Sequence, residues 1–141
     1  MRNLLSLFDV SADETLEILA LAKDLKHDFE RGLRKPILAG KVMGLLFEKQ
    51  SLRTRVSFES AMRHLGGGSL FLGDGVGWGK RESTKDFSSV LSHLVDVIVC
   101  RAKSHDKVGE LARFSSCPVI NGLTDLYHPC QALADLLTIL E

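Results

Sequence analysis

A polar turn that opens a predicted helix carries the first residues suited to chemistry. Ser51, Arg53, Thr54 and Arg55 follow directly after the apolar run 41–48. The first NH groups of a helix have no partner inside it and lie at the positive end of its dipole, so a phosphate gains hydrogen bonds and charge complementarity there. Guanidinium groups add planar forks that fit phosphate or carboxylate oxygens. The stretch therefore predicts a site for a small dianion.

Further polar residues follow the later apolar runs. Arg101 ends one of them, and Asn121, His128 and Gln131 follow the last one. In an open parallel sheet, ligands bind beyond the carboxyl ends of the strands. We therefore expect these side chains at one rim of a sheet, together with the polar turn at 51–55.

The combined set suits an acyl-phosphate substrate. Arginine and backbone NH groups can hold the phosphate, while Thr54, Arg101 and His128 can polarise a carbonyl and stabilise the oxyanion formed when an amine attacks it. Gln131 can recognise an NH2 group, because its amide both donates and accepts hydrogen bonds. This chemistry requires no metal ion.

Each of these residues also has a plainer interpretation. Arg53 and Arg55 can be solvated helix residues, although a strand leading straight into the turn favours an anion site. Arg101 can simply end a strand. His128, which precedes Pro129, can begin a helix without any chemical role.

The glycine-rich loop 73–79 leaves two interpretations open. It can be a surface turn in which Trp78 packs locally, or a lid or contact with another subunit. Cys130 resembles a nucleophile, but no acid is visibly placed to orient His128 as its base. Cys100 lies inside an apolar run and is expected in the core.

Hydrophobic periodicity and turn residues predict an alternation of helices and strands. The helices are predicted at 11–31, 53–65, 84–94, 106–115 and 129–141, and the strands at 41–48, 69–72, 95–100 and 118–120. Four strands separated by helices predict an α/β domain, with a four-stranded parallel sheet in three α/β/α layers.

Composition limits the class of protein. The chain has 141 residues, of which 45% are hydrophobic, enough for about one domain with its own core. Its 18 basic and 18 acidic residues balance, which argues against a general nucleic-acid or membrane surface. The three cysteines form no C-x-x-C pair, and no long apolar run is present, so a cytoplasmic protein without disulfides is expected.

Taken together, the motifs resemble the transcarbamoylase family, and within it the ornithine carbamoyltransferases most. The motifs are Phe-Glu-Lys-Gln-Ser-Leu-Arg-Thr-Arg-Val-Ser-Phe-Glu at 47–59, Arg-Glu-Ser at 81–83 with Asp86, Arg101, and Asn-Gly-Leu-Thr-Asp-Leu-Tyr-His-Pro-Cys-Gln-Ala-Leu-Ala-Asp at 121–135. The similarity spans essentially the whole chain, in the same order and spacing.

The resemblance implies that residues 1–141 are a carbamoyl-phosphate-binding domain, with the amino-acid-binding second domain absent from this chain. The implied reaction transfers the carbamoyl group from carbamoyl phosphate to the side-chain amine of ornithine, giving citrulline and phosphate without a cofactor. It belongs to arginine metabolism and amino-acid biosynthesis, and the whole protein would be a cytoplasmic homotrimer.

Two other functions stay open at this point. The chain can be a domain of a carbamoyltransferase for aspartate or another amine, or a phosphate-binding module that does not catalyse. The last predicted helix runs to the final residue without a glycine or proline terminator, which suggests a fragment. We expect the isolated chain to be inactive.

The resemblance also implies a role for each phosphate-binding residue. Ser51, Arg53, Thr54 and the backbone of Leu52 would hold the phosphate, and Arg101 would bridge the phosphate and the carbonyl oxygen. Leu52 stands where the family usually has threonine. The missing hydroxyl predicts slightly weaker phosphate binding, although a backbone NH contact survives the change.

The remaining roles concern the carbamoyl group and the neighbouring subunit. His128 would bind the carbonyl oxygen and Gln131 the carbamoyl amide, which makes Arg101 and His128 the implied catalytic residues. The family supplies one loop side chain to the adjacent subunit's site. Here Trp78 or Lys80 is the candidate, because the usual glutamine of ornithine enzymes is missing.

Overall fold

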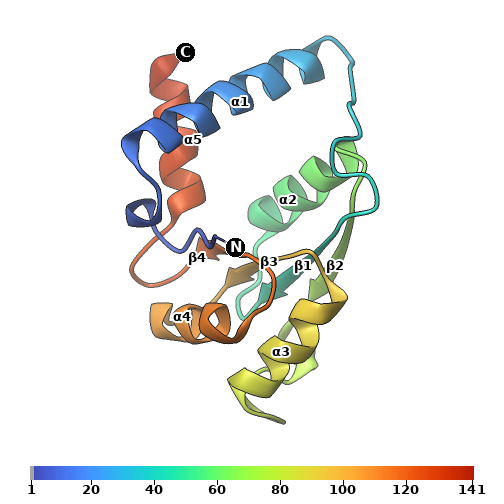
Figure 1. Ribbon diagram of the computed structural model, residues 1–141, viewed down its shortest axis with the longest axis vertical. Helices are drawn as coiled ribbons and strands as arrows, with labels where there is room; N and C mark the ends of the chain where they lie inside the picture. Colours follow the sequence, from blue (N-terminus) through green and yellow to red (C-terminus); the bar gives the residue numbers. More distant parts are fainter. Residues whose placement is uncertain (1) are drawn as a thin grey trace.

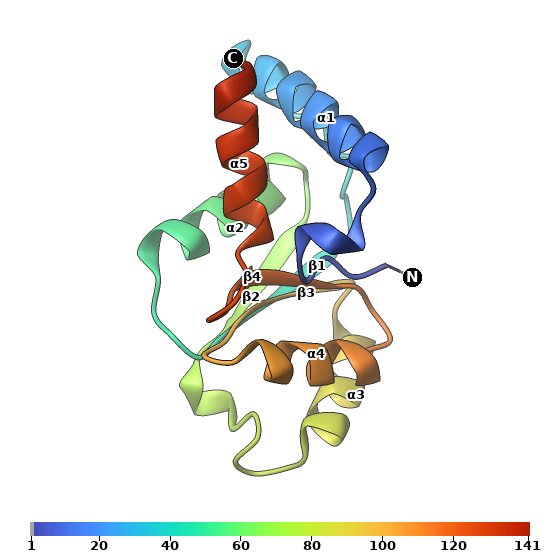
Figure 2. The same cartoon turned by 90° about the vertical axis from the view of Figure 1, so that its left-hand side faces the viewer.

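A computed structural model describes residues 2–141 and contains one parallel sheet (Figures 1 and 2). Its strand order is β2-β1-β3-β4, and every neighbouring pair is parallel. The strands are β1 (Val42–Phe47), β2 (Gly68–Leu72), β3 (Val97–Arg101) and β4 (Val119–Leu123). The predicted four-stranded parallel sheet is therefore confirmed, although β4 runs three residues further than expected.

Helices cover both faces of the sheet, which confirms the three-layer prediction. In Figure 2, α3 and α4 lie below the sheet, while α2 lies above it and α1 packs against α5. The helices are α1 (Ala12–Glu30), α2 (Leu52–His64), α3 (Thr84–Leu94), α4 (His105–Phe114) and α5 (Pro129–Leu140), with short 3-10 turns at Leu7–Asp9 and Asp74–Val76.

Strand alternation divides the core into two halves. Leu46, Ile98 and Cys100 face the helices α3 and α4, in a cluster that includes Leu111 from α4. The alternate strand residues Met43, Leu45, Phe47 and Val99 form a second cluster on the other side, together with Met62 of α2. Burial on both faces explains why the strands read as continuous apolar runs.

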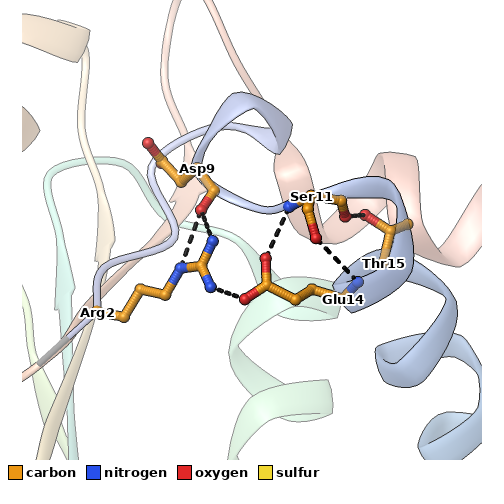
Figure 3. A network of polar contacts seen from close by, with 5 residues as sticks. All are labelled: Arg2, Asp9, Ser11, Glu14 and Thr15. Carbon is orange, nitrogen blue, oxygen red and sulfur yellow. Dashed lines mark hydrogen bonds and ion pairs between the residues drawn. The ribbon is translucent and has the colours of Figure 1, made fainter.

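Serine caps define where the helices begin. Ser11 accepts a hydrogen bond from the backbone NH of Glu14, and the Glu14 carboxylate accepts one from the NH of Ser11, as the capping-box spacing predicts. Arg2 pairs with the same carboxylate and donates to the carbonyl of Asp9 (Figure 3). These contacts fix the N-terminal segment to the start of α1.

A glycine follows the end of α2. Gly66 has a φ of 84°, a left-handed conformation that side chains with a Cβ avoid. A Cβ placed there would lie 2.7 Å from the Cβ of Pro36. Glycine is therefore required at position 66 for two reasons. The backbone is left-handed there, and Pro36 in the loop between α1 and β1 comes too close for a Cβ.

Helix α1 departs from its sequence pattern. Its apolar residues recur at helical spacing, yet only Leu19 is fully buried. Leu16 and Leu21 remain 60% and 55% exposed, because α1 contacts α5 rather than the sheet. Across residues 2–141, the helices are all too short or too polar to cross a membrane.

Candidate functional site

The strand register brings three turns to one edge of the sheet. Phe47 at the end of β1 pairs with Arg101 at the end of β3, and Arg101 pairs with Leu123 at the end of β4. The turns that follow lead to Ser51 before α2 and to His128 before α5. Side chains more than seventy residues apart in the sequence therefore meet at this edge.

A pocket of about 390 Å³ lies where these turns meet. Six residues predicted from the sequence line it, and four more complete the wall. The lining residues are Ser51, Arg53, Thr54, Ser57, Phe58, Arg101, His128, Cys130, Gln131 and Ala134. The structure thus brings together the guanidinium, hydroxyl, imidazole and carboxamide groups that the sequence pattern singled out.

Hydroxyl groups link the helix start to Arg101. The Ser51 hydroxyl accepts from the backbone NH of Thr54 at 3.4 Å and donates to the Thr54 hydroxyl at 3.0 Å. The Nη1 of Arg101 donates to that same hydroxyl at 3.1 Å. Because Arg53 is exposed at the pocket wall, the start of α2 and the end of β3 together present two guanidinium groups, those of Arg53 and Arg101, to one small space.

Two buried nitrogen atoms at this site have no protein partner among residues 2–141. They are the Nε of Arg101 and the Nδ1 of His128. A buried polar atom without a partner costs about 1–3 kcal/mol, so such atoms mark places where a ligand or a water molecule completes the bonding. Both residues line the pocket.

The surroundings of the His128 imidazole favour its neutral form. Burial lowers its pKa, and the positive charge of Arg101 lowers it further, while Asp135 acts weakly in the opposite direction. A neutral imidazole can donate one hydrogen bond and accept another. It can therefore bind a carbonyl oxygen without adding a second full charge beside Arg101.

Gln131 completes the α5 side of the pocket. Its side-chain NH2 donates to a carboxylate oxygen of Asp135 at 2.8 Å, one helical turn further on. This bond orients the amide so that its carbonyl oxygen is the group left to accept from a substrate NH2. Gln131 is thus arranged as an acceptor at the pocket wall.

Two residues of the polar turn lie outside the pocket lining. The side chain of Leu52 is 79% exposed, at the first position of α2, where only its backbone NH can serve an anion. Arg55 bonds Glu59 at 3.0 Å and stacks 3.7 Å above the ring of Phe71. Arg55 is therefore engaged on the far side of the turn, and Arg53 is the guanidinium that α2 contributes.

The glycine-rich loop takes Trp78 away from this pocket. Its indole is only 6% exposed and stacks on Phe87 with ring centroids 6.3 Å apart. The ammonium of Lys107 lies 5.3 Å from the same ring. Of the two open interpretations, local packing of Trp78 matches the structure. Lys80 is exposed in that loop, and a role of either residue in a neighbouring subunit stays a prediction.

Sequence reasoning missed three residues of the pocket wall, namely Ser57, Phe58 and Ala134. Ser57 and Phe58 lie one helical turn after Arg53 and Thr54, so helical spacing alone could have identified them. Ala134 stands in the same relation to Gln131. These residues shape the wall without adding charge.

Cys130 also lines the pocket, as a protonated thiol. Burial raises its pKa to about 11, and its Sγ lies 3.7 Å from the carbonyl of Asn121, to which it donates. A thiol that stays protonated at neutral pH is a poor nucleophile. Cys100, with an exposure of 0%, is in the core as expected.

Comparison with known proteins assigns the class. Residues 2–141 match the family model described as "Aspartate/ornithine carbamoyltransferase, carbamoyl-P binding domain". The chain therefore belongs to the aspartate and ornithine carbamoyltransferase family, which confirms the resemblance seen in its motifs.

Individual relatives are ornithine carbamoyltransferases. The chain is 49% identical over 142 residues to the one from Wolinella succinogenes and 50% identical over 141 residues to the one from Halalkalibacterium halodurans. It covers 46% and 44% of those two proteins, with 100% and 99% of its own length. The chain thus spans about half the length of the curated relatives it matches.

Solved structures agree with this similarity. The ornithine carbamoyltransferase from Pyrococcus furiosus has a TM-score of 0.96 and 46% identity, with 98% of this chain and 44% of that chain covered. The catalytic subunit of the aspartate transcarbamoylase from M. jannaschii has a TM-score of 0.90 and 35% identity, with 99% and 47% covered.

Proposed function

We propose that this chain is the carbamoyl-phosphate-binding domain of an ornithine carbamoyltransferase. The whole protein transfers the carbamoyl group from carbamoyl phosphate to the side-chain amine of ornithine, giving citrulline and phosphate. A second domain, absent from residues 1–141, supplies the ornithine site. Family membership and the names of the relatives support this proposal.

The phosphate is bound at the start of α2. Ser51, Arg53, Thr54 and the backbone NH of Leu52 provide its hydrogen-bond donors, in the positive field of the helix N-terminus. Arg101 neutralises charge on the phosphate and also reaches the carbonyl oxygen. Loss of phosphate as the leaving group is favoured because these donors stabilise its growing negative charge.

The carbamoyl group is held by the other side of the pocket. His128 donates a hydrogen bond to the carbonyl oxygen, and Arg101 shares in stabilising the oxyanion that forms when the amine attacks. The carbonyl oxygen of Gln131 accepts from the carbamoyl NH2. The acceleration comes from orientation and from this charge stabilisation, without a covalent intermediate and without a cofactor.

The single observation that carries the proposal is the pairing of Arg101 with Thr54. Their bond of 3.1 Å joins the end of β3 to the phosphate-binding start of α2, with His128 in the same pocket wall. This supports a role for Arg101 as the guanidinium that reaches both the phosphate and the carbonyl oxygen of an acyl phosphate. A module that bound phosphate alone would have no use for His128 and Gln131 beside it.

The test is an assay of the protein in its full length, with carbamoyl phosphate and either ornithine or aspartate. We expect citrulline with ornithine and no product with aspartate. The isolated chain 1–141 should bind carbamoyl phosphate weakly in calorimetry and form no citrulline. Carbamoyl-aspartate as the main product would refute the choice of ornithine, and the absence of any product would favour a binding module.

We also propose that the full-length protein is a homotrimer in the cytoplasm, with Trp78 or Lys80 as the residue closest to a neighbouring site. Light scattering of the purified protein measures the assembly. A monomer with full activity would contradict a shared active site.

A further inference from the structure

The side chain of Asn121 is an amide with an exposure of 0%, on β4 behind the pocket. Its Nδ2 donates to the carbonyl of Leu5 at 2.8 Å and to the carbonyl of Tyr127 at 3.1 Å. Its Oδ1 accepts from the backbone NH of Leu123 at 2.9 Å. Both ends of the amide are therefore engaged by backbone groups of two separate segments.

One of these backbone groups is the carbonyl of the residue that directly precedes His128. Thr124 reinforces the same place, because its backbone NH donates to the Tyr127 carbonyl at 3.0 Å and its hydroxyl accepts from the Tyr127 NH at 3.2 Å. Tyr127, which leads into His128, is thus held through both its NH and its carbonyl by Asn121 and Thr124, and the side chain of Asn121 is completely buried.

The turn held in this way departs from relaxed backbone geometry. Leu123 has a φ of 144°, in a region that residues with side chains rarely occupy. Such a conformation persists only where the surrounding contacts enforce it. The bond from the Leu123 NH to Asn121 is one of those contacts, so the amide supports both ends of the turn 123–127.

The backbone of Asn121 holds the other side of His128. Its carbonyl accepts from the thiol of Cys130 in the first turn of α5. Tyr127, just before His128, and Cys130, two positions after it, are therefore both hydrogen-bonded to Asn121 of β4.

We propose that Asn121 is a positioning residue, which sets the place of the His128 imidazole in the pocket. Asn121 does not line the pocket and touches no substrate. The inference rests on the proposed function for one point only, namely that His128 binds the carbonyl oxygen of carbamoyl phosphate.

The hydrogen-bond pattern requires an amide at this position. Two carbonyl oxygens, those of Leu5 and Tyr127, converge on Nδ2, so a donor is needed there. Aspartate has the same shape but offers an oxygen in place of the donor. The variant Asn121→Asp therefore sets oxygen against oxygen, while it keeps the acceptor for the NH of Leu123.

Three variants of the full-length protein test the role. Asn121→Asp removes the donor, and Thr124→Val removes the hydroxyl with little change of shape. Asn3→Asp is the matched control, because it makes the same chemical change in the N-terminal segment that lies beside β4. Its remaining oxygen can still accept from the NH of Val119, as Oδ1 does now at 2.9 Å.

The measurements distinguish an effect on the position of the His128 imidazole from an effect on phosphate binding. Calorimetry gives the affinity for inorganic phosphate and for carbamoyl phosphate, and NMR gives the pKa of His128, assigned from the spectrum of His128→Gln. In Asn121→Asp and Thr124→Val, we expect carbamoyl phosphate to bind about tenfold more weakly, phosphate to change by less than about twofold, and the His128 pKa to rise towards its ordinary value. Asn3→Asp should match the wild type.

Each outcome decides the proposal. An unchanged His128 pKa in both folded variants, or an equal loss of affinity for both ligands, would overturn it. If Asn121→Asp fails to fold, Thr124→Val decides alone. Failure of the wild type to bind carbamoyl phosphate would refute the proposed function instead, while the NMR measurement would still report on the positioning of the imidazole.

Discussion

The turn after β1 and the loop after β2 begin at the same edge of the sheet, but they use their polar residues differently. The first is short and leads at once into α2, so that Ser51, Arg53 and Thr54 line the pocket. The second is longer and glycine-rich, and it folds Trp78 back into the core, where the indole stacks on Phe87 of α3. A position at the functional edge is therefore not enough to make a residue part of the site.

The difference follows from loop length and from capping. A short turn has few conformations, and the capping hydroxyl of Ser51 fixes where the helix and its free NH groups lie. A long loop with several glycines must be stabilised by what it buries. Here the indole of Trp78 provides that burial. The next three predictions test this division of roles, and a fourth concerns His128 in the same pocket.

Replacement of Trp78 should have the largest effect, and this effect should be on stability. Trp78→Ala removes a side chain that is 6% exposed, and loss of a buried aromatic costs about 3 kcal/mol or more in the free energy of unfolding. Urea unfolding followed by circular dichroism measures it, with Trp78→Phe as the milder control. A stable variant that no longer binds phosphate would reverse the roles of the two loops.

Replacement of Arg53 should affect binding and spare stability. Arg53→Ala loses a charge-assisted pair and should weaken carbamoyl phosphate binding by about 2 kcal/mol or more, while Arg53→Lys recovers only part because it lacks the planar fork. Calorimetric titration with carbamoyl phosphate or inorganic phosphate measures the difference. Unchanged affinity in the alanine variant would remove Arg53 from the site.

Removal of the serine caps of α2 and α3 compares the turn after β1 with the loop after β2 directly. Ser51→Ala and Ser83→Ala each remove a hydroxyl that accepts from a backbone NH at a helix start, and each should cost about 1 kcal/mol of stability. Only Ser51→Ala should also weaken phosphate binding, because Ser83 caps α3 outside the pocket. Equal phosphate affinities in the two variants would show that the cap at α2 has no binding role.

The smallest effect concerns the pH dependence of stability. Because the pKa of His128 is lowered in the folded protein, the unfolded chain takes up this proton first as the pH falls. Stability should therefore decrease below about pH 6.5, and His128→Gln should remove that part of the decrease. Unfolding measured at several pH values in both proteins tests it. A wild type that loses no more stability than His128→Gln would show that the imidazole is not held neutral.

Most of the fold could be predicted because it depends on local signals. Hydrophobic periodicity and turn residues predicted the five α-helices and the four strands, although not the two short 3-10 turns. The carboxyl-end rule placed Arg101 and His128 beside the turn at Ser51. The first residues after a strand are constrained by the strand itself. Their position is therefore the part of a site that a sequence pattern predicts best.

Tertiary contacts decided the rest. Asn121 looked like one more polar residue after a strand. Only its partners at Leu5 and Tyr127 show that its amide joins the distant N-terminal segment to the turn that follows β4. The leucines of α1 followed a burial pattern, but the helix packs on α5 and leaves Leu16 exposed. Periodicity predicts which face of a helix is apolar and cannot predict what will cover it.

The joining of the N-terminal segment to β4 has a consequence for the order of folding. The backbone of Leu4 bridges Ile120, and two neighbouring hydrogen bonds each join residues 116 positions apart. Closing so large a loop is slow and costs entropy that local helices do not pay. Protection of the amides of Val119 and Asn121, which donate to Asn3 and Leu4, against solvent exchange should thus arise late in refolding. The Asn121 side chain gains its partner at Leu5 only with this last closure.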